Sequence, residues 1–235
     1  MKKTIGFNMK VWQHHLDYVA KHFNETSRNQ FAEDVLAYIA GDIVGQRSRD
    51  KTKTILWKIW VNVPDRYQSL RDEAARLFPQ LTRSERVALH WGLTVLAYPF
   101  FHTVVHELGR LFRLQEVVHS QQIVRKMHSL YGERHSVGVA TTAVLSTLRE
   151  WQVIRTAHRC ENTMADKITI DVPTVKQWFA QVVVHASGKS YLSIDELNRQ
   201  HAFFPFDSAI NLEDLDQSVL IVTRHGFDRM IVGID

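Results

Sequence analysis

Apolar residues recur every three or four positions through the first half of the chain, which is the spacing of one face of a helix. From Phe31 to Ile43 this spacing continues over successive turns and ends near Gly41. The stretch of residues 64–80 begins with Pro64, and its helical pattern stops before Pro79, as expected for a helix. These patterns predict a mainly α fold that opens with a helical domain, of about five or six helices, over residues 1–117.

Residues 87–106 contain no Lys, Arg, Asp or Glu, and twenty such residues are long enough to cross a bilayer. Three histidines interrupt the segment, and Pro99 stands in its second half. Thr82 and Glu85, at the spacing of a capping box, precede it. We therefore expect a pair of buried helices broken near Pro99 and no membrane partner, with a membrane span as the alternative.

A second pattern of elements begins at residue 118. Ser120 is a candidate N-cap and Gly132 a candidate end for one helix. The next helix is expected to start near Ser136 or Val137. One of its faces is apolar, and the opposite face carries small or polar residues with a basic end. The apolar face comprises Ala140, Val144, Leu148 and Trp151, and the polar face Gly138, Thr142, Ser146 and Arg149.

A β-hairpin is expected directly after this helix. Residues 153–160 suit one strand and residues 167–171 its partner, with residues 161–165 as the turn. Helix, turn, helix and hairpin occur in this order in winged helices. The chain over residues 118–172 therefore resembles a winged-helix domain with a β-hairpin wing.

The last segment, residues 173–235, differs in charge from the rest. It carries 5 Lys and Arg against 8 Asp and Glu, whereas residues 1–171 carry 24 against 17. It contains a helix over residues 174–188, a capping-box pattern at Ser193 and Glu196, and two candidate strands near its end. We expect a small acidic α+β unit, or a second winged-helix-like unit, that recruits a protein partner or mediates self-association.

The winged-helix interpretation predicts a surface for double-stranded DNA. The second helix would enter the major groove, and the hairpin would lie along the phosphate backbone. Candidate contacts from the helix and its start are Arg134, His135, Ser136, Thr141, Thr142, Ser146 and Arg149, and those from the wing are Arg155, His158, Arg159 and Lys167.

Residues 45–60 supply a second basic element. Its lysines and arginines alternate with Ser and Thr, a composition that suits contacts to phosphates regardless of base sequence. We interpret the stretch as a basic loop that leads into a helix whose tryptophans, Trp57 and Trp60, belong to the core. The candidate phosphate contacts are Arg47, Arg49, Lys51 and Lys53.

Catalytic patterns are absent from the sequence, so we expect a protein that is not an enzyme and uses no cofactor. His102 and His106 lie one helical turn apart, but neither order of the zinc-protease motif is completed around them, so no metal site is expected there. The single cysteine, Cys160, excludes an internal disulfide and fits a reducing, cytoplasmic setting.

Three stretches together resemble the BrxA proteins of BREX phage-defence systems: KTKTILWKIW, ALHWGLTVLAYPFFHTVVHELGRL and SVGVATTAVLSTLREWQVI. The resemblance implies a helical bundle with a winged-helix-like element, DNA binding, and a place in a multi-protein bacterial defence system. None of the stretches is a diagnostic motif, so no functional residue carries over. A structural adaptor that docks on a protein, and an RNA-binding helical protein, remain the alternatives.

Overall fold

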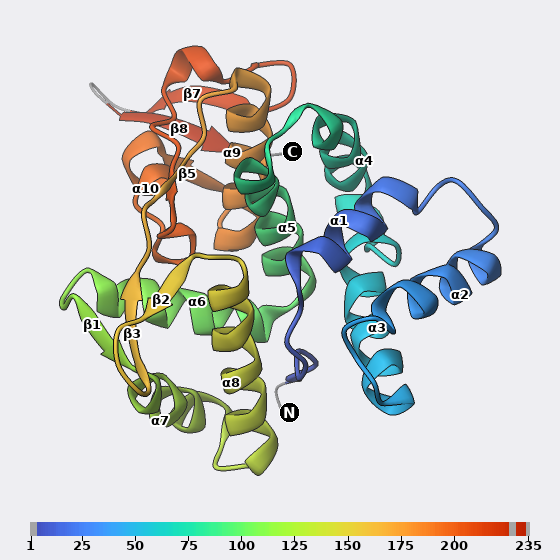
Figure 1. Ribbon diagram of the computed structural model, residues 1–235. Coiled ribbons are helices and arrows are strands. Elements are labelled where there is room, and N and C mark those ends of the chain that lie inside the picture. Colours follow the sequence, from blue (N-terminus) through green and yellow to red (C-terminus); the bar gives the residue numbers. More distant parts are fainter. Residues whose placement is uncertain (1–3, 226–228, 234–235) are drawn as a thin grey trace.

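The computed structural model describes residues 4–225 and 229–233, and these residues are mainly helical (Figure 1). Short 3-10 turns join several of the helices. The α-helices are α1 (Gln13–His22), α2 (Arg28–Ile39), α3 (Gln46–Trp60), α4 (Gln68–Leu77), α5 (Arg83–Ala97), α6 (Pro99–Phe112), α7 (Ser120–Tyr131), α8 (His135–Glu150), α9 (Pro173–Ser187) and α10 (Ile194–Asn198). The 3-10 turns are η1 (Asp65–Tyr67), η2 (Phe78–Gln80), η3 (His201–Phe203) and η4 (Leu212–Asp214).

The strands are short and form small sheets. One antiparallel sheet has the order β1–β3–β2, another has the order β5–β8–β7, and β4 pairs with β6 in parallel. In each three-stranded sheet the strand that comes last in the sequence, β3 or β8, lies in the middle. The strands are β1 (Val117–His119), β2 (Ile154–Thr156), β3 (Glu161–Met164), β4 (Ile168–Thr169), β5 (Tyr191–Ser193), β6 (Phe206–Asp207), β7 (Ile221–His225) and β8 (Arg229–Gly233).

Helix α5 lies at the centre of the molecule, between α1–α4 on the right of Figure 1 and the remaining elements on the left. Its start is the predicted capping box: the Thr82 hydroxyl accepts from the Glu85 N–H, and the Glu85 carboxylate accepts from the Thr82 N–H at 2.8 Å. From Val87 to Val95 every residue of α5 is buried. A helix that is apolar on all sides needs neighbours on all sides, and α5 has them.

The predicted helix pair of residues 87–106 is confirmed. Helix α5 ends at Ala97, and Pro99 opens α6, where its missing N–H costs nothing. Within the described residues, no helix has both the length and the apolar character needed to cross a bilayer.

The Trp91 indole connects segments that are far apart in the sequence. Its ring centroid lies 5.4 Å from that of Phe101 in α6 and 6.2 Å from that of Trp151 at the end of α8. It also lies 5.9 Å from Phe204 and 5.5 Å from Phe206 in the C-terminal segment. Its N–H donates to the carbonyl of Ala202 at 3.0 Å. One apolar core therefore runs through all parts of the chain.

The prediction of a basic loop after residue 45 is wrong. Residues 46–60 form the continuous helix α3, so the basic residues lie on its first two turns. The interpretation of the tryptophans holds: Trp60 is fully buried, and the half-buried Trp57 stacks on Phe31 with ring centroids 5.1 Å apart.

The predicted hairpin exists, but its pairing differs. Residues 161–165 are the expected turn, but residues 161–164 form the strand β3. This strand pairs with β2, for example through Thr156 and Asn162. The chain reverses earlier, over residues 157–160, where Cys160 takes a positive φ of 67°. Residues 167–171 contain β4, which pairs with β6. Lys167 therefore does not lie on this hairpin.

The starts of helices α7 and α8 each lie within one residue of the predicted position. The N-cap of α7 is His119, one residue before the predicted Ser120, and Gly132 is its C-cap. All four residues of the predicted apolar face of α8, from Ala140 to Trp151, are buried.

The C-terminal segment contains the expected helix, capping box and strand pair. Hydrogen bonds from Ser193, together with Lys189, lower the pKa of Glu196 to about 2, so the cap of α10 is charged at neutral pH. Strands β7 and β8 form the pair, and the connection over residues 226–228 lies outside the described residues.

Two glycines inside helices give a matched test of the packing of η3 on α6. A Cβ on Gly109 would lie 2.1 Å from the carbonyl oxygen of His201, whereas a Cβ on Gly138 would meet only the end of the His128 side chain at 3.4 Å. We expect Gly109→Ala to lower the free energy of unfolding by about 1–3 kcal/mol or more, because the backbone must move.

The control, Gly138→Ala, should be neutral or stabilising by up to about 1 kcal/mol, because alanine is the better helix former. Urea unfolding of both variants measures this, and equal effects would contradict the close approach.

Candidate nucleic-acid interface

One face of α8 is exposed along its length. His135, Val139 and Thr142 are exposed and Ser146 is half-exposed, at successive spacings of four, three and four. The opposite face is buried against the core. Because the exposed side chains are small or medium in size, this face allows another surface to approach the helix closely.

Helix α7 lies beside α8 and adds basic side chains that the sequence analysis missed. Gln121, Arg125 and Ser129 are exposed at helical spacing, and Lys126 is half-exposed, while Ile123 and Met127 are buried. The alternation of these two faces was visible in the sequence and could have identified Arg125.

The tip of the β2–β3 hairpin is exposed and joined to the start of α7. All four residues from 157 to 160, including His158 and Arg159, are exposed. The carbonyl of Cys160 accepts from the Ser120 N–H at 2.8 Å. The tip and α7 are therefore neighbours, and both lie on the lower side of the molecule in Figure 1.

Arg149, a predicted contact, serves the protein interior instead. Its guanidinium donates to Asn162 Oδ1 at 2.6 Å and to Ser120 Oγ at 3.3 Å. Asn162 is fully buried, and its amide also donates to the carbonyl of Val118 at 2.8 Å. Partial burial lowers the pKa of Arg149 from its usual value, but arginine stays charged at neutral pH. The network joins α8, α7, β1 and β3.

Two further helix predictions need correction or refinement. Thr141 is fully buried, and its hydroxyl donates to the Val137 carbonyl at 2.8 Å, so it cannot reach a partner. Arg134 is half-buried at the N-cap of α8 and donates to the Tyr131 carbonyl at 3.1 Å. His135 and Ser136 are exposed at the start of the helix, as the prediction requires.

Arg155 and Lys167 line a groove of about 1060 Å³ between the hairpin, the start of α5 and the chain around β4. Arg149 and Arg83 also line it, together with Glu85, Asp166 and Asp171. Arg155 is paired with Asp166 at 2.6 Å, and both side chains are well exposed. The groove thus holds charges of both signs, and its basic groups do not form an uninterrupted positive site.

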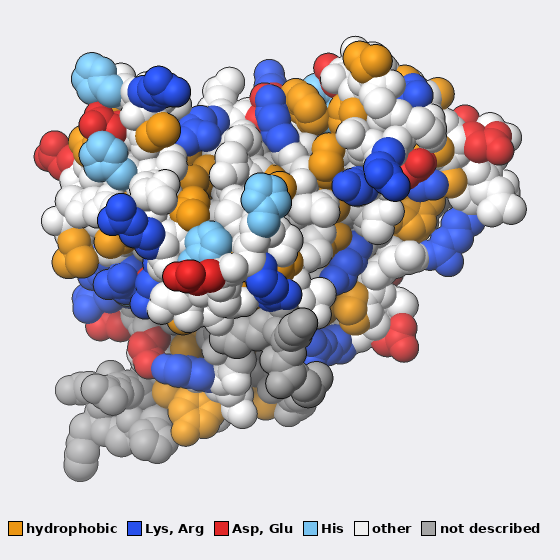
Figure 2. Space-filling model, turned by 90° about the horizontal axis from the view of Figure 1, so that it is seen from below, with side chains coloured by type: hydrophobic (Ala, Val, Ile, Leu, Met, Phe, Trp, Pro, Cys, Tyr) orange, Lys and Arg blue, Asp and Glu red, His pale blue; other side chains and the backbone are white. Residues whose placement is uncertain are grey.

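Helix α3 presents a second exposed stripe, formed by Arg47, Lys51, Thr54 and Lys58. Arg49 and Lys53 are half-buried beside it. The first turns of α3 and α8 both lie on the lower side of Figure 1. Figure 2 views this side and shows Lys and Arg side chains scattered across it, with fewer acidic ones between them.

No family model, curated protein or solved structure matches the chain.

The structural role assigned to Arg149 can be tested by stability. Arg149→Met should lower the free energy of unfolding by about 1.5–3 kcal/mol, because the buried Asn162 Oδ1 loses a charged donor. Ser146→Ala, one turn earlier on the exposed face, should change it by no more than about 0.5 kcal/mol. Urea unfolding of both variants measures the difference, and a silent Arg149→Met would return this residue to the set of surface contacts.

Proposed function

We propose that this protein is a non-enzymatic DNA-binding subunit that contacts duplex DNA through α8 and the tip of the β2–β3 hairpin. The observation that carries the proposal is the element order α6–β1–α7–α8–β2–β3 closed by a sheet of order β1–β3–β2. This order is typical of a winged helix, and here one face of the second helix, α8, and the hairpin tip are both exposed.

The exposed face of α8 suits the floor of a major groove. Thr142 and Ser146 can donate or accept hydrogen bonds, and Val139 offers an apolar contact for a thymine methyl group. The half-exposed Gly138 has no side chain to hold the helix away from the bases. In this arrangement the helix itself carries little charge, so the phosphate contacts have to come from its neighbours.

Those neighbours are basic. Arg125 is exposed on α7, which packs against α8, and His158 and Arg159 are exposed on the hairpin tip, which contacts the start of α7. Relative to the sequence-based hypothesis, the contact set gains Arg125. It loses Thr141 and Arg149, which serve the interior, and Lys167, which is not part of the hairpin.

The stripe on α3 extends the proposed surface. Cations near a helix N-terminus oppose the helix dipole at a cost of about 0.3–1 kcal/mol each. The first turn of α3 nevertheless contains Arg47 and no acidic residue. Basic side chains at the positive end of a helix bind phosphate oxygens favourably. Phosphate binding therefore accounts for an arrangement that does not stabilise the fold.

A role in a multi-protein bacterial system, with phage defence as the expected setting, follows from the resemblance to BrxA proteins. In that setting the acidic C-terminal segment would bind a protein partner or a second copy of the chain.

A protein-docking adaptor is the second candidate, favoured by one observation. Leu114, Val117 and Met164 are exposed apolar residues around the β1–β3 pair, and Leu114 is 73% exposed. A protein partner could cover them, and the adaptor hypothesis requires that the basic surface bind no nucleic acid.

Charge reversal tests the phosphate contacts. Arg125→Glu with Arg159→Glu should weaken binding to a labelled random-sequence duplex at least tenfold, about 1.4 kcal/mol. The slope of log affinity against log salt should also become shallower by about 2, because each lost phosphate contact contributes about 0.9. Fluorescence anisotropy across a salt series measures both quantities.

The matched control is Arg66→Glu with Arg76→Glu. These two exposed residues lie around α4, on the upper side of Figure 1, and their reversal changes the net charge equally. Equal loss in both double variants would mean that only net charge matters and would contradict a localised surface. Preference for single-stranded RNA over the duplex in the same series would favour the RNA-binding alternative.

A single substitution tests the α8 face. Thr142→Glu places a carboxylate in the middle of that face and should reduce duplex affinity at least tenfold, because it would bring a negative charge into the groove between the two phosphate backbones. Ser69→Glu on the exposed side of α4 is the control and should leave affinity unchanged. Full affinity of a folded Thr142→Glu protein would eliminate α8 as the recognition helix.

A further inference from the structure

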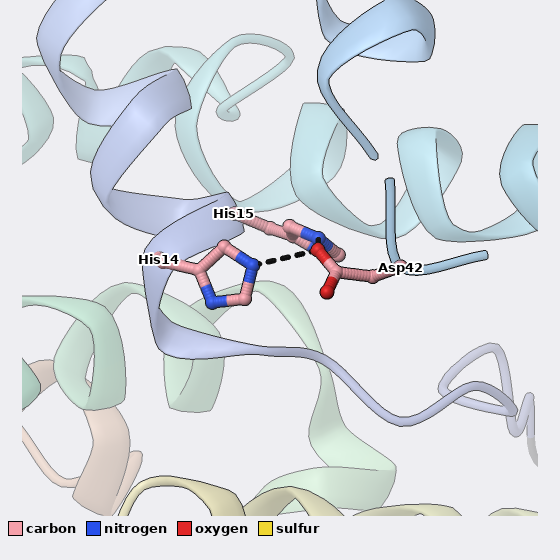
Figure 3. Close-up of side chains that lie close together, drawn as sticks. All are labelled: His14, His15 and Asp42. Atoms are coloured by element: carbon pink, nitrogen blue, oxygen red, sulfur yellow. Dashed lines mark hydrogen bonds and ion pairs between the residues drawn. The ribbon is translucent and has the colours of Figure 1, made fainter. Parts of the chain in front are cut away.

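Two histidines and an aspartate converge where the start of α1 meets the turn after α2. His14 and His15 belong to the first turn of α1, and Asp42 lies in the turn after α2 (Figure 3). Both imidazoles direct their Nε2 atoms at the same carboxylate oxygen. The distances to Asp42 Oδ2 are 2.8 Å from His14 and 2.9 Å from His15.

Aromatic neighbours hold the two rings in place. The His15 ring centroid lies 5.1 Å from that of Trp12 and 6.0 Å from that of Tyr38, and the His14 ring lies 6.1 Å from Tyr38. His15 is fully buried, while His14 and Asp42 are each more than a third exposed. The cluster is thus rigid on its inner side and open to solvent on its outer side.

An ordinary histidine–aspartate pair elsewhere in the chain looks different. His90 Nε2 pairs with a single carboxylate, Asp17, at 2.9 Å, and His90 Nδ1 accepts from the Trp60 indole at 3.2 Å. Both nitrogens of that buried ring have partners. At Asp42, in contrast, two rings share one oxygen, and the buried Nδ1 of His15 has no hydrogen-bond partner. Hydrogen bonds within the fold explain the placement of His90, but they do not explain why two imidazoles share one oxygen of Asp42.

We propose that His14, His15 and Asp42 bind a divalent transition-metal ion of the zinc class. The three candidate ligand atoms all lie within 4.8 Å of one another, a spacing that one ion can bridge. Two imidazoles and a carboxylate form a ligand set typical of zinc, and water can complete the tetrahedron from the exposed side.

The cluster has to rearrange to take the ion. With metal–ligand bonds of about 2.0–2.1 Å, tetrahedral ligand atoms lie roughly 3.3 Å apart. The two imidazole nitrogens, which lie within 4.8 Å of each other, have to reach this separation, and the carboxylate of Asp42 has to retreat by about half an ångström from the rings. It can do so because it stands in an exposed turn rather than in a helix.

The chemistry of the ligands excludes magnesium and calcium as the preferred ions. Those ions take oxygen ligands, whereas two of the three ligands here are imidazole nitrogens. Burial lowers the pKa of His15, which agrees with the neutral imidazole that a metal requires. A bound ion would fasten the start of α1 to the segment that leads into α3.

The test uses the full chain, free of any histidine tag and stripped with a chelator. Competition with a chromophoric chelator should give one zinc ion per chain with micromolar or tighter affinity, and magnesium should not compete. Zinc should also raise the thermal midpoint. Cobalt(II), used as a spectroscopic probe, should give the visible absorption of a tetrahedral site.

Asp42→Asn and His14→Ala should each weaken zinc binding at least tenfold. Asparagine keeps the size of the side chain and His14 is partly exposed, so both variants should fold, as circular dichroism can confirm. The control is His22→Ala on the same helix, where His22 has its own carboxylate partner, Glu25, and zinc affinity should stay unchanged. Absence of one-to-one binding, or equal affinity in all three variants, would overturn the proposal. Because no DNA is present, the result does not depend on the proposed function.

Discussion

Burial of the Trp91 indole is the constraint on which the rest of the arrangement depends. A tryptophan buries roughly 150–250 Å² on folding, and its N–H needs a partner once water is removed. Here α6, the end of α8 and the C-terminal segment supply the rings, and Ala202 supplies the acceptor. Segments that are distant in the sequence must therefore assemble around one side chain. This explains why the core is continuous although the strands are short and the sheets small.

The same constraint positions the proposed recognition helix. Its inner side is held by the N-terminal segment, where the Val11 N–H donates to Thr147 Oγ1 and the Val11 carbonyl accepts from the Trp151 indole. Lys10 and Glu150 add an ion pair at 3.0 Å. With its inner side fixed, α8 presents the outer stripe on a rigid support, which is what contact with a shaped surface requires. Lys10 and Val11, which are not among the proposed DNA contacts, are part of that support.

The helices could be predicted because their signals are local. Proline at the start of α6, the capping box of α5 and the apolar spacing of α8 depend on neighbours within a few residues. The register of the hairpin could not be predicted from the sequence, because it depends on the buried Asn162. The cost of burying Asn162 is compensated by a hydrogen bond from Arg149, which belongs to another element. No short-range pattern indicates that such a polar residue is internal. The cluster at Asp42 was missed for a related reason, since adjacent histidines gain meaning only once α1 and the α2–α3 turn are placed together.

The candidate contact residues divide in the same way. Exposure of His135, Thr142 and Arg159 follows from their positions opposite an apolar face or in a turn, so pattern alone identified them. Thr141 and Arg149 have equally suitable chemistry, but their hydrogen bonds run inward. Residue type and spacing therefore predicted which elements have an exposed polar face, while the partners within the fold determine which side chains remain exposed.

The hairpin tip is already ordered by main-chain hydrogen bonds. The Ala157 N–H donates to the Glu161 carbonyl at 3.2 Å, and the Glu161 N–H donates to the His158 carbonyl at 2.9 Å. Fixing the backbone of a flexible residue costs about 1–2 kcal/mol, and a disordered tip of this length would lose several kcal/mol on docking. In this chain that conformational entropy is lost during folding. A partner that docks against the tip meets a preformed loop, so that at the tip only the side chains remain to be ordered on association.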